Sequence, residues 1–193
     1  MKLAVFAAAA NACPPYDSIR QPAMSEFTNA EFAGVWYVQA TNEPAVPNRT
    51  VLSCPCNVYT VTLPGPSKLG PHSYSMKYVS ACGDRVFGYH NLTVPLEGYW
   101  NASQPGLHYE NYAHASTYWP TMIFNASFGN RNQGMEWLSV YACESGGKTS
   151  FQLLSRVMQP SPAVVDGFVQ AAGDLGLDVS GLHVSDFRTC GWA

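Results

Sequence analysis

The chain has 193 residues, a length that suits one domain with a single core. Its formal net charge at neutral pH is −3 and only 12% of its residues are charged, which excludes a surface built to hold a polyanion such as nucleic acid. Aromatic residues make up 13% of the chain, and 14 prolines and 16 glycines accompany them. This composition favours many short strands and turns over long helices.

The first twelve residues have the pattern of a secretory signal peptide. One positive charge at Lys2 precedes an apolar run, and Ala10-Asn11-Ala12 offers a cleavage site between small residues. An apolar first helix of the mature domain is the alternative. No later stretch approaches the roughly 20 apolar residues needed to cross a bilayer. We therefore expect a signal peptide over 1–12, one domain over 13–193 and no transmembrane segment.

Cysteines and glycosylation sequons also favour export. The six cysteines are an even number scattered along the chain, as in disulfide-bonded secreted domains. Sequons begin at four asparagines, which are Asn48, Asn91, Asn101 and Asn125. Cys54-Pro55-Cys56 has a spacing that also occurs in metal sites, but no second Cys or His pair lies at zinc-finger spacing. We expect two disulfides to start from Cys54 and Cys56, and no metal.

After the signal peptide, the chain up to Ala30 contains several prolines and predicts an irregular arm rather than a packed element. Eight short β-rich runs follow, separated by clusters of Gly, Pro, Asn and Ser. The runs are 32–40, 57–63, 73–81, 85–94, 106–116, 119–128, 135–143 and 149–157. This order indicates an all-β protein, either an up-and-down barrel or a sandwich.

One segment after the strands, 161–176, has the pattern of an amphipathic helix. Ser161 is placed to cap the amides of the first turn, and Pro162 suits the first helical position. The apolar stripe consists of Val164, Val165, Phe168, Val169 and Ala172. Gly173 and Gly176 favour the end of the helix. A helix with one apolar face must pack that face against another element, here the wall of the barrel.

Two motifs resemble the signature of the lipocalin family. Gly34-Val35-Trp36-Tyr37 resembles the G-x-W motif of the first strand, and Leu153-Leu154-Ser155-Arg156 resembles the closing strand with its terminal arginine. The resemblance implies an eight-stranded antiparallel up-and-down barrel with one C-terminal α-helix packed outside. It also implies that Gly34, Trp36 and Arg156 close one end, with the guanidinium over the indole ring.

Within the family, the two ends of the chain and the region of Cys143 resemble the apolipoprotein D group. That resemblance implies the disulfides Cys13–Cys143 and Cys54–Cys190, and leaves Cys56 and Cys82 for a third bridge. On the eighth strand, where that group has a tryptophan in its pocket, this chain has Gln152. The ligand preference of that group is therefore not carried over.

A weaker resemblance is to the lipocalin domain of violaxanthin de-epoxidases. It is carried by Gln104-Pro105-Gly106-Leu107, by the aromatic run onward to Trp119 and by Thr189-Cys190-Gly191. The Cys-rich and Glu-rich regions of those enzymes are missing here, as is their acidic pair after the first strand. Opening an epoxide needs a proton donor in the pocket, and the sequence offers no obvious candidate.

The alternation of side chains along the strands predicts which residues line the barrel. Tyr74, Met76 and Tyr78 alternate with polar residues and are expected inside, and an outward-facing Cys54 places Tyr59 and Val61 inside as well. Phe87 and Tyr89 are added from the fourth run, and Phe124 and Leu154 from their position in the chain alone. The full predicted lining is Tyr59, Val61, Tyr74, Met76, Tyr78, Phe87, Tyr89, Phe124 and Leu154. Ordinary core packing is the alternative for each of them.

The five histidines do not form a catalytic or metal-binding group by spacing. His108 and His114 lie on the same face of a predicted strand but too far apart to share one ion, and we expect them at the surface or at the barrel mouth. No serine lies in a G-x-S-x-G setting. We therefore predict no catalytic residue, no metal and no cofactor.

Three functional hypotheses follow. The first is a secreted, non-enzymatic carrier of a small hydrophobic ligand, which is a lipid, sterol-like compound, retinoid, bilin or carotenoid. The second is a xanthophyll enzyme or pigment-binding protein of a plastid thylakoid lumen. The third is a glycosylated structural subunit of a larger assembly, in contact with a membrane surface or with other proteins.

Overall fold

The computed structural model describes residues 13–42, 53–84, 88–112, 117–128, 134–143 and 148–190. Its strands form one antiparallel sheet. They are β1 (Gly34–Thr41), β2 (Ser53–Thr62), β3 (Ser73–Asp84), β4 (Gly88–Trp100), β5 (Leu107–Tyr112), β6 (Trp119–Phe128), β7 (Met135–Cys143), β8 (Thr149–Ser155) and β9 (His183–Val184). The helices are α1 (Tyr16–Ile19) and α2 (Pro162–Asp174), and four short 3-10 turns accompany them: Pro22–Ser25, Asn29–Phe32, Ser67–Leu69 and Phe187–Thr189.

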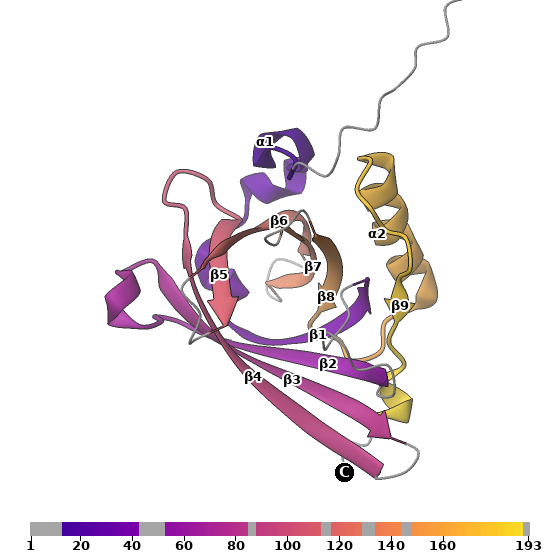
Figure 1. The fold of residues 1–193 in the computed structure, drawn as a ribbon. Coiled ribbons are helices and arrows are strands. Elements are labelled where there is room, and N and C mark those ends of the chain that lie inside the picture. Colours follow the sequence, from indigo (N-terminus) through magenta and orange to yellow (C-terminus); the bar gives the residue numbers. More distant parts are fainter. Residues whose placement is uncertain are drawn as a thin grey trace, which may run out of the picture.

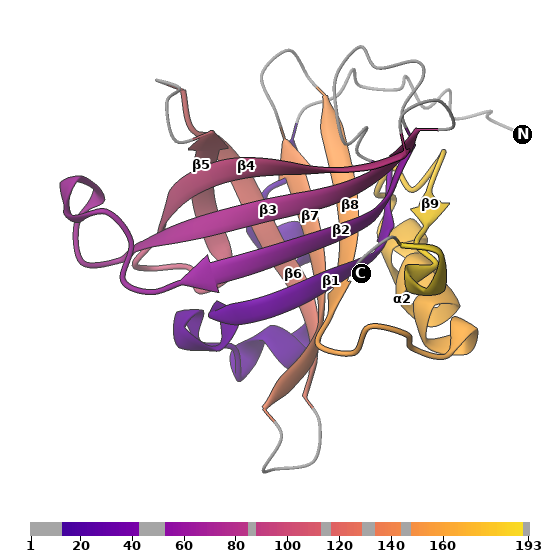
Figure 2. The same cartoon turned by 90° about the horizontal axis from the view of Figure 1, so that it is seen from below.

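The first eight strands close into a barrel. Each strand from β2 to β7 pairs with the next, β8 pairs with β1, and β1 pairs with β2 to complete the ring. Figure 1 looks along the barrel, and Figure 2 shows β1 to β4 side by side on one wall. The up-and-down barrel that the sequence predicts is confirmed, and the sandwich is wrong.

Apolar side chains divide into a cluster inside the barrel and a cluster outside its wall. Among the described side chains, the inner cluster takes residues from every barrel strand except β5, including Trp36, Tyr59, Tyr74, Leu96, Ile123, Leu138 and Leu154. Residues from opposite strands of a closed barrel can meet only in its interior. The outer cluster joins β6, β7 and β8 to the helices, and includes Phe124, Trp137, Phe151, Leu153, Val165 and Ala172.

Helix α2 packs outside the barrel beside β8, as predicted (Figure 1). The expected cap is wrong, because the Ser161 side chain makes no capping hydrogen bond and its backbone carbonyl accepts from Val164 N at 3.1 Å instead. The buried stripe is also narrower than predicted. Val165 and Ala172 are buried, whereas Val164 is 37% exposed.

The N-terminal arm is packed, which corrects the expectation of an irregular arm. Its helix and turns are short, but they bury a side chain every few residues. Met24, Phe27 and Phe32 belong to the inner cluster, and Tyr16 and Ile19 belong to the outer one. Short turns can bury apolar residues whose spacing matches neither a long helix nor a strand. The arm therefore covers the end of the barrel at which β1 begins.

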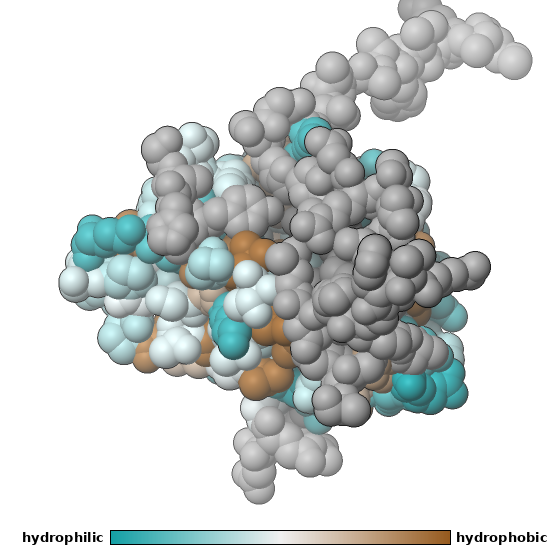
Figure 3. All heavy atoms as spheres, turned by 60° about the horizontal axis from the view of Figure 1, so that its bottom comes forward, coloured by the Kyte–Doolittle hydropathy of each residue, from teal (hydrophilic) through white to brown (hydrophobic). Residues whose placement is uncertain are grey.

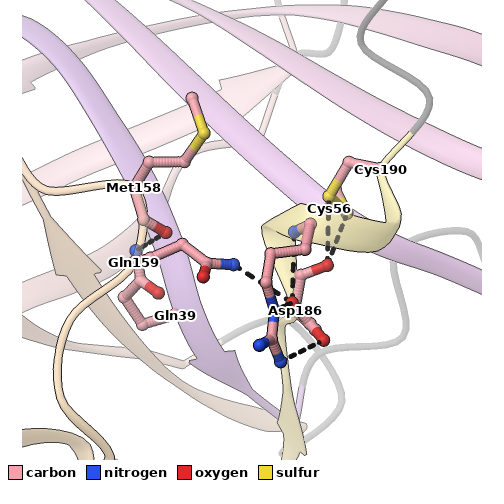
Figure 4. Close-up of a disulfide and its surroundings, with 7 residues drawn as sticks. Gln39, Cys56, Met158, Gln159, Asp186 and Cys190 are labelled. Carbon is pink, nitrogen blue, oxygen red and sulfur yellow. Dashed lines mark hydrogen bonds and ion pairs between the residues drawn. A yellow bond between two sulfur atoms is a disulfide. The ribbon is translucent and has the colours of Figure 1, made fainter.

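Two disulfides lie among the described residues. They are Cys13–Cys143 and Cys56–Cys190, with Cα–Cα distances of 5.7 and 5.9 Å. The first joins the start of the arm to the end of β7 and agrees with the pairing implied by the lipocalin resemblance. The second joins β2 to the C-terminal segment (Figure 4).

The second disulfide corrects two implied pairings. Cys190 is bonded to Cys56 rather than to Cys54, so Cys56 does not pair with Cys82. Cys56 packs with Phe187 in a small cluster on the outer face of β2, and the register of β2 against β3 shifts just before it. The C-terminal segment is therefore held by the second cysteine of the Cys-Pro-Cys run. The side chains of Cys54 and Cys82 lie outside the described residues.

Several other predictions lie outside the described residues. They concern the signal peptide 1–12, Asn48, Phe87 and His114, and the side chains of Tyr89 and Asn91. The remaining sequon residues, Asn101 and Asn125, are half-buried, and their glycosylation stays a prediction. Among the described residues, no helix is long and apolar enough to cross a membrane. On the coloured part of the face shown in Figure 3, hydrophilic and weakly polar residues predominate, with a few hydrophobic ones near the centre.

Candidate functional site

One end of the barrel is closed by Trp36 and Arg156. The guanidinium carbon of Arg156 lies 3.5 Å from the centroid of the indole ring. The same group donates hydrogen bonds of 2.6–2.8 Å to three backbone carbonyls, those of Glu31, Ala33 and Val35. Trp36 Nε1 donates to the Phe32 carbonyl at 2.8 Å. The indole N–H and the guanidinium at this end therefore have partners.

Gly34 allows the arginine to come this close. Its φ is +101°, a value that favours glycine, and a Cβ at this position would lie 2.9 Å from Arg156 Nη1. The structure therefore brings together the three residues that the sequence predicts to close the barrel. The contact with Arg156 explains why a glycine stands at position 34.

Beyond this closed end, a cavity lies inside the barrel. It is lined by Phe32, Tyr59, Met76, His108, Glu110, Thr121, Val140, Gln152 and Leu154. Tyr59, Met76 and Leu154 belong to the predicted lining. Val61 and Tyr74 are buried in the inner cluster, and Tyr78 packs against it. The cavity is therefore apolar on part of its wall and polar on the rest.

Phe124 does not reach the interior, which corrects its predicted place. It lies in the outer cluster with its ring centroid 6.3 Å from that of Phe151. The register of β6 against β7 shifts between Ile123 and Asn125, and this irregularity changes the alternation of the strand. Ile123 and Ala126 both belong to the inner cluster, so counting back from Ala126 by twos gives the wrong side for Phe124.

Strand β5 supplies the polar wall of the cavity. His108 is 1% exposed and Glu110 is 9% exposed, and both line the cavity. Tyr109 between them stacks on Tyr99 of the neighbouring strand. The expectation that His108 lies at the surface or mouth is therefore wrong. Its polarity suggested solvent, but the register of β5 turns this face of the strand inward.

Glu110 is held by donors from β3 and β6. Tyr74 Oη donates to Glu110 Oε2 at 3.0 Å, and Thr121 Oγ1 donates to Oε1 at 3.1 Å. His108 Nε2 lies 3.6 Å from Oε2. Burial by itself raises the pKa of Glu110, but His108 and the two hydroxyl donors outweigh it, and the pKa is lowered. Glu110 is therefore a buried carboxylate.

The Tyr74 hydroxyl that donates to Glu110 stays protonated. Burial and the neighbouring Glu110 charge raise the pKa of Tyr74 well above its ordinary value. Tyr74 reaches Glu110 across Gly98, since Tyr74 pairs with Gly98 and Gly98 pairs with Glu110 in adjacent strands. A Cβ at Gly98 would collide with the Tyr74 ring. The glycine therefore makes room for this hydrogen bond.

A second polar pair lines the same cavity from other strands. Tyr59 Oη on β2 donates to Gln152 Oε1 on β8 at 2.9 Å. The resemblance to apolipoprotein D drew attention to Gln152 only as a departure. Its hydrogen bond to a predicted lining residue makes it part of the site.

Two buried nitrogens near the polar wall have no hydrogen-bond partner among the described residues. They are His108 Nδ1 and Trp100 Nε1, and the two rings lie with centroids 4.6 Å apart. An unpaired polar group in a protein interior costs about 1–3 kcal/mol. Across the described ranges, no three His, Cys, Asp or Glu residues gather in a way that could hold a metal ion.

Sequence reasoning missed His108, Glu110 and Thr121 as site residues. One signal was available, because His108 and Glu110 are two apart in a predicted strand and must share a face. That face was interpreted as solvent-exposed. Thr121 carries no such signal, since a lone threonine in a strand is common.

Comparison with known proteins shows the fold. No protein-family model matches the chain, and no curated protein matches it. Apocrustacyanin C1 is similar in structure, with a TM-score of 0.63 and 16% identity over 95% of this chain and 93% of that one. Lobster apocrustacyanin A1 has a TM-score of 0.59 and 16% identity over 91% of this chain and 88% of its own. At this identity the likeness concerns the fold alone, and the chain has the lipocalin-type barrel that these apocrustacyanins share.

Proposed function

We propose that the protein is a secreted carrier that holds a small hydrophobic ligand inside the barrel. The observation that supports it is the interior cavity, with Phe32, Met76 and Leu154 on its wall and the barrel closed behind it by Trp36 and Arg156. Ligand pockets are mostly apolar with a few placed polar groups. Burial of apolar ligand surface, at roughly 25 cal/mol per Å², provides the affinity.

The ligand is a lipid, sterol-like compound, retinoid, bilin or carotenoid. We propose Tyr59, Val61, Tyr74, Met76, Tyr78 and Leu154 as its lining from the predicted set, with Phe32 and Val140 added. The cavity is small, and the space inside it that is open to a water-sized molecule is about 10 Å³. That is room for about one water molecule, far below the roughly 300–1,000 Å³ of typical ligand pockets. Entry of a lipid-sized ligand therefore requires side chains of the lining to move aside.

Export is part of the same proposal. The two disulfides favour an oxidising compartment. The signal peptide over 1–12, the glycosylation of the sequons and the kinship with the apolipoprotein D group belong to this proposal as well. Mass spectrometry of the protein from its native source checks the first two directly, through the mature N-terminus and the glycan masses.

The central test is whether the barrel holds a ligand. Organic molecules that co-purify with the protein from its native source are identified by mass spectrometry, and we expect one consistent hydrophobic compound. In parallel, the purified protein is titrated with the neutral fluorescent probe N-phenylnaphthylamine. A barrel that is consistently empty and does not bind the probe contradicts the proposal.

A matched pair of variants locates the probe. Val140→Phe adds a ring to the cavity wall and is expected to weaken probe binding at least about tenfold, because the space is small. Val164→Phe adds the same ring on the exposed side of α2, where Val164 is 37% exposed, and should leave binding unchanged. Equal effects of the two variants contradict a site inside the barrel.

One observation favours the second candidate, a xanthophyll enzyme of a plastid lumen. His108 and Glu110 place two titratable groups in the cavity, where the sequence alone offers no acid or base. The test is ascorbate-dependent conversion of an epoxy-carotenoid by the purified protein. Binding of the pigment without any change in its absorption spectrum contradicts the enzyme and agrees with the carrier.

A further inference from the structure

We infer that the inner end of the ligand donates a hydrogen bond to Glu110, so that the barrel takes apolar molecules ending in a hydroxyl or ammonium group and rejects those ending in a carboxylate. This inference rests on the proposed carrier function. It assigns the chemistry of the ligand's polar end, which neither the fold nor an apolar cavity specifies.

The first argument is the acceptor capacity of Glu110. An ionised carboxylate has two oxygens and about four positions for accepted hydrogen bonds, and it donates none. The protein fills one position on Oε1 from Thr121, and Tyr74 and His108 Nε2 take the two positions on Oε2. One position on Oε1 therefore remains on a carboxylate that lines the cavity. A ligand hydroxyl or ammonium fits such a position, and a second carboxylate does not.

The second argument is the charge of the cavity wall. Among the described residues that line the cavity there is no Lys or Arg, and His108 is the one group of this lining able to carry a positive charge. Like charges repel strongly where water is excluded, because the effective dielectric constant is low. A fatty-acid carboxylate brought next to Glu110 therefore has no cation to offset the repulsion except this histidine.

The third argument is the unpartnered nitrogen of His108. Its Nε2 faces the Glu110 carboxylate at 3.6 Å, which favours a proton on Nε2. In the neutral ring, Nδ1 is then an acceptor, and it has no partner among the described residues. With the ring in this neutral form, the open positions on Glu110 and His108 both accept hydrogen bonds, and a donor on the ligand matches this wall of the cavity.

A purely structural role explains these residues less well. A buried charged group is often no more stabilising than apolar residues of similar volume. The other strands of this barrel direct mainly apolar side chains into the inner cluster, whereas no described side chain of β5 belongs to that cluster. Position 98 is a glycine, and the absence of a side chain there lets Tyr74 reach Glu110. The arrangement is accounted for by a ligand that uses it.

The experiment uses three probes with the same chain and different ends. Dodecanol, dodecylamine and dodecanoate compete with bound N-phenylnaphthylamine at neutral pH, where the acid is ionised and the amine is protonated. We expect the alcohol and the amine to bind at least about tenfold more tightly than the acid, the effect of one hydrogen bond to a charged group. The ratio of amine to alcohol shows whether the ligand's positive charge adds to the affinity.

Two variants tie the preference to Glu110. Glu110→Gln keeps the shape and removes the charge, and it should bring the affinities of dodecanol and dodecanoate close together. Glu97→Gln is the matched control, because Glu97 is also buried on this sheet but bonds to Tyr118 and Lys68 instead of lining the cavity. It should keep the wild-type preference.

The outcomes separate the inference from the function on which it rests. If neither the fluorescent probe nor any dodecyl compound binds, the carrier function and this inference both fall. If they bind and the wild type does not prefer the alcohol, or Glu110→Gln keeps the preference, the inference alone is overturned. Should Glu110→Gln not fold, the isosteric Thr121→Val frees a position on Oε1 and should increase the preference for the alcohol. A decrease contradicts the inference.

Discussion

The closed end of the barrel and its polar β5 wall are both buried and both contain a charged side chain, yet they are built differently. At the closed end, Arg156 has three carbonyl partners and an indole ring beneath it, and Trp36 has its own partner. On the β5 wall, Glu110 has two hydroxyl donors and His108 keeps one nitrogen unpaired. The guanidinium of Arg156 and the indole N–H of Trp36 at the closed end have hydrogen-bond partners, whereas the β5 wall keeps open hydrogen-bonding positions.

The difference indicates which region serves stability and which serves binding. A saturated buried network fixes one conformation and offers nothing to a ligand. A wall with open acceptor positions costs stability in the empty protein and regains it when a donor arrives. Substitutions at the closed end should therefore act on stability, and substitutions on the β5 wall should act mainly on ligand preference.

The largest effect is expected from Trp36→Ala at the closed end. Removing this fully buried side chain leaves a cavity beneath Arg156 and should lower the free energy of unfolding by about 3–5 kcal/mol. Denaturant titration followed by circular dichroism measures it. Val35→Ala, one residue away and 42% exposed, is the control and should have little effect. A loss at Trp36 no larger than the control's contradicts its role in closing the barrel.

The next largest effect on stability is expected from Gly98→Ala, which acts on the β5 wall. The added Cβ collides with the Tyr74 ring, so we expect a loss of about 1–3 kcal/mol and a broken Tyr74–Glu110 hydrogen bond. Gly167→Ala is the matched control in α2, where nothing lies within 4 Å of the added atom. There the better helix propensity of alanine should stabilise by about 0.5–1 kcal/mol. Thermal unfolding distinguishes the two signs.

Arg156→Lys tests whether the closed end needs a guanidinium. A lysine keeps the charge but cannot reach three carbonyls with one planar group, so we expect a loss of about 1–2 kcal/mol. Arg188→Lys changes an arginine whose side chain is 76% exposed and should have no measurable effect. Arg156→Lys should also keep the preference for dodecanol over dodecanoate. Loss of this preference contradicts the assignment of stability to the closed end and of ligand preference to the β5 wall.

The smallest effect is a change in the pH dependence of stability. The folded pKa of Glu110 is lowered, so its contribution is present above its unfolded pKa of about 4.5 and is lost as the pH falls through the folded value. Glu110→Gln should therefore lose stability less steeply than the wild type below that pH. Urea titrations at a series of acid pH values measure the slope. An unchanged slope means that the hydrogen bonds to the Glu110 carboxylate do not contribute to the free energy of unfolding.

Motifs carried the prediction of the closed end. The G-x-W run and the arginine ending the eighth strand indicated which residues meet, and Arg156 lies over Trp36 in the structure. The sequence also predicts which residues of β2 and β3 face the barrel interior, because these strands alternate regularly over several residues and all their inward positions fall on one face. Tyr59, Val61, Tyr74 and Met76 all belong to the inner cluster.

The sequence predicts the wrong side of the barrel wall where the backbone is irregular, and also where a polar side chain is buried. Phe124 lies outside the barrel because the β6 register shifts beside it. Cys56 rather than Cys54 meets Cys190, with a register shift in β2 just before it. His108 is buried although its polarity suggested solvent. In each case the deciding contact lies on another strand or segment.

The amino-acid sequence by itself determined the order of the strands, the helix after them, and the motif that closes the barrel, since these depend on local periodicity and on residues with special geometry. The tertiary structure alone decided that His108, Glu110, Thr121 and Gln152 share one cavity, and which cysteine holds the C-terminal segment. The physical reason is that register between strands sets which side chains meet. A one-residue shift exchanges inside for outside without changing the local pattern.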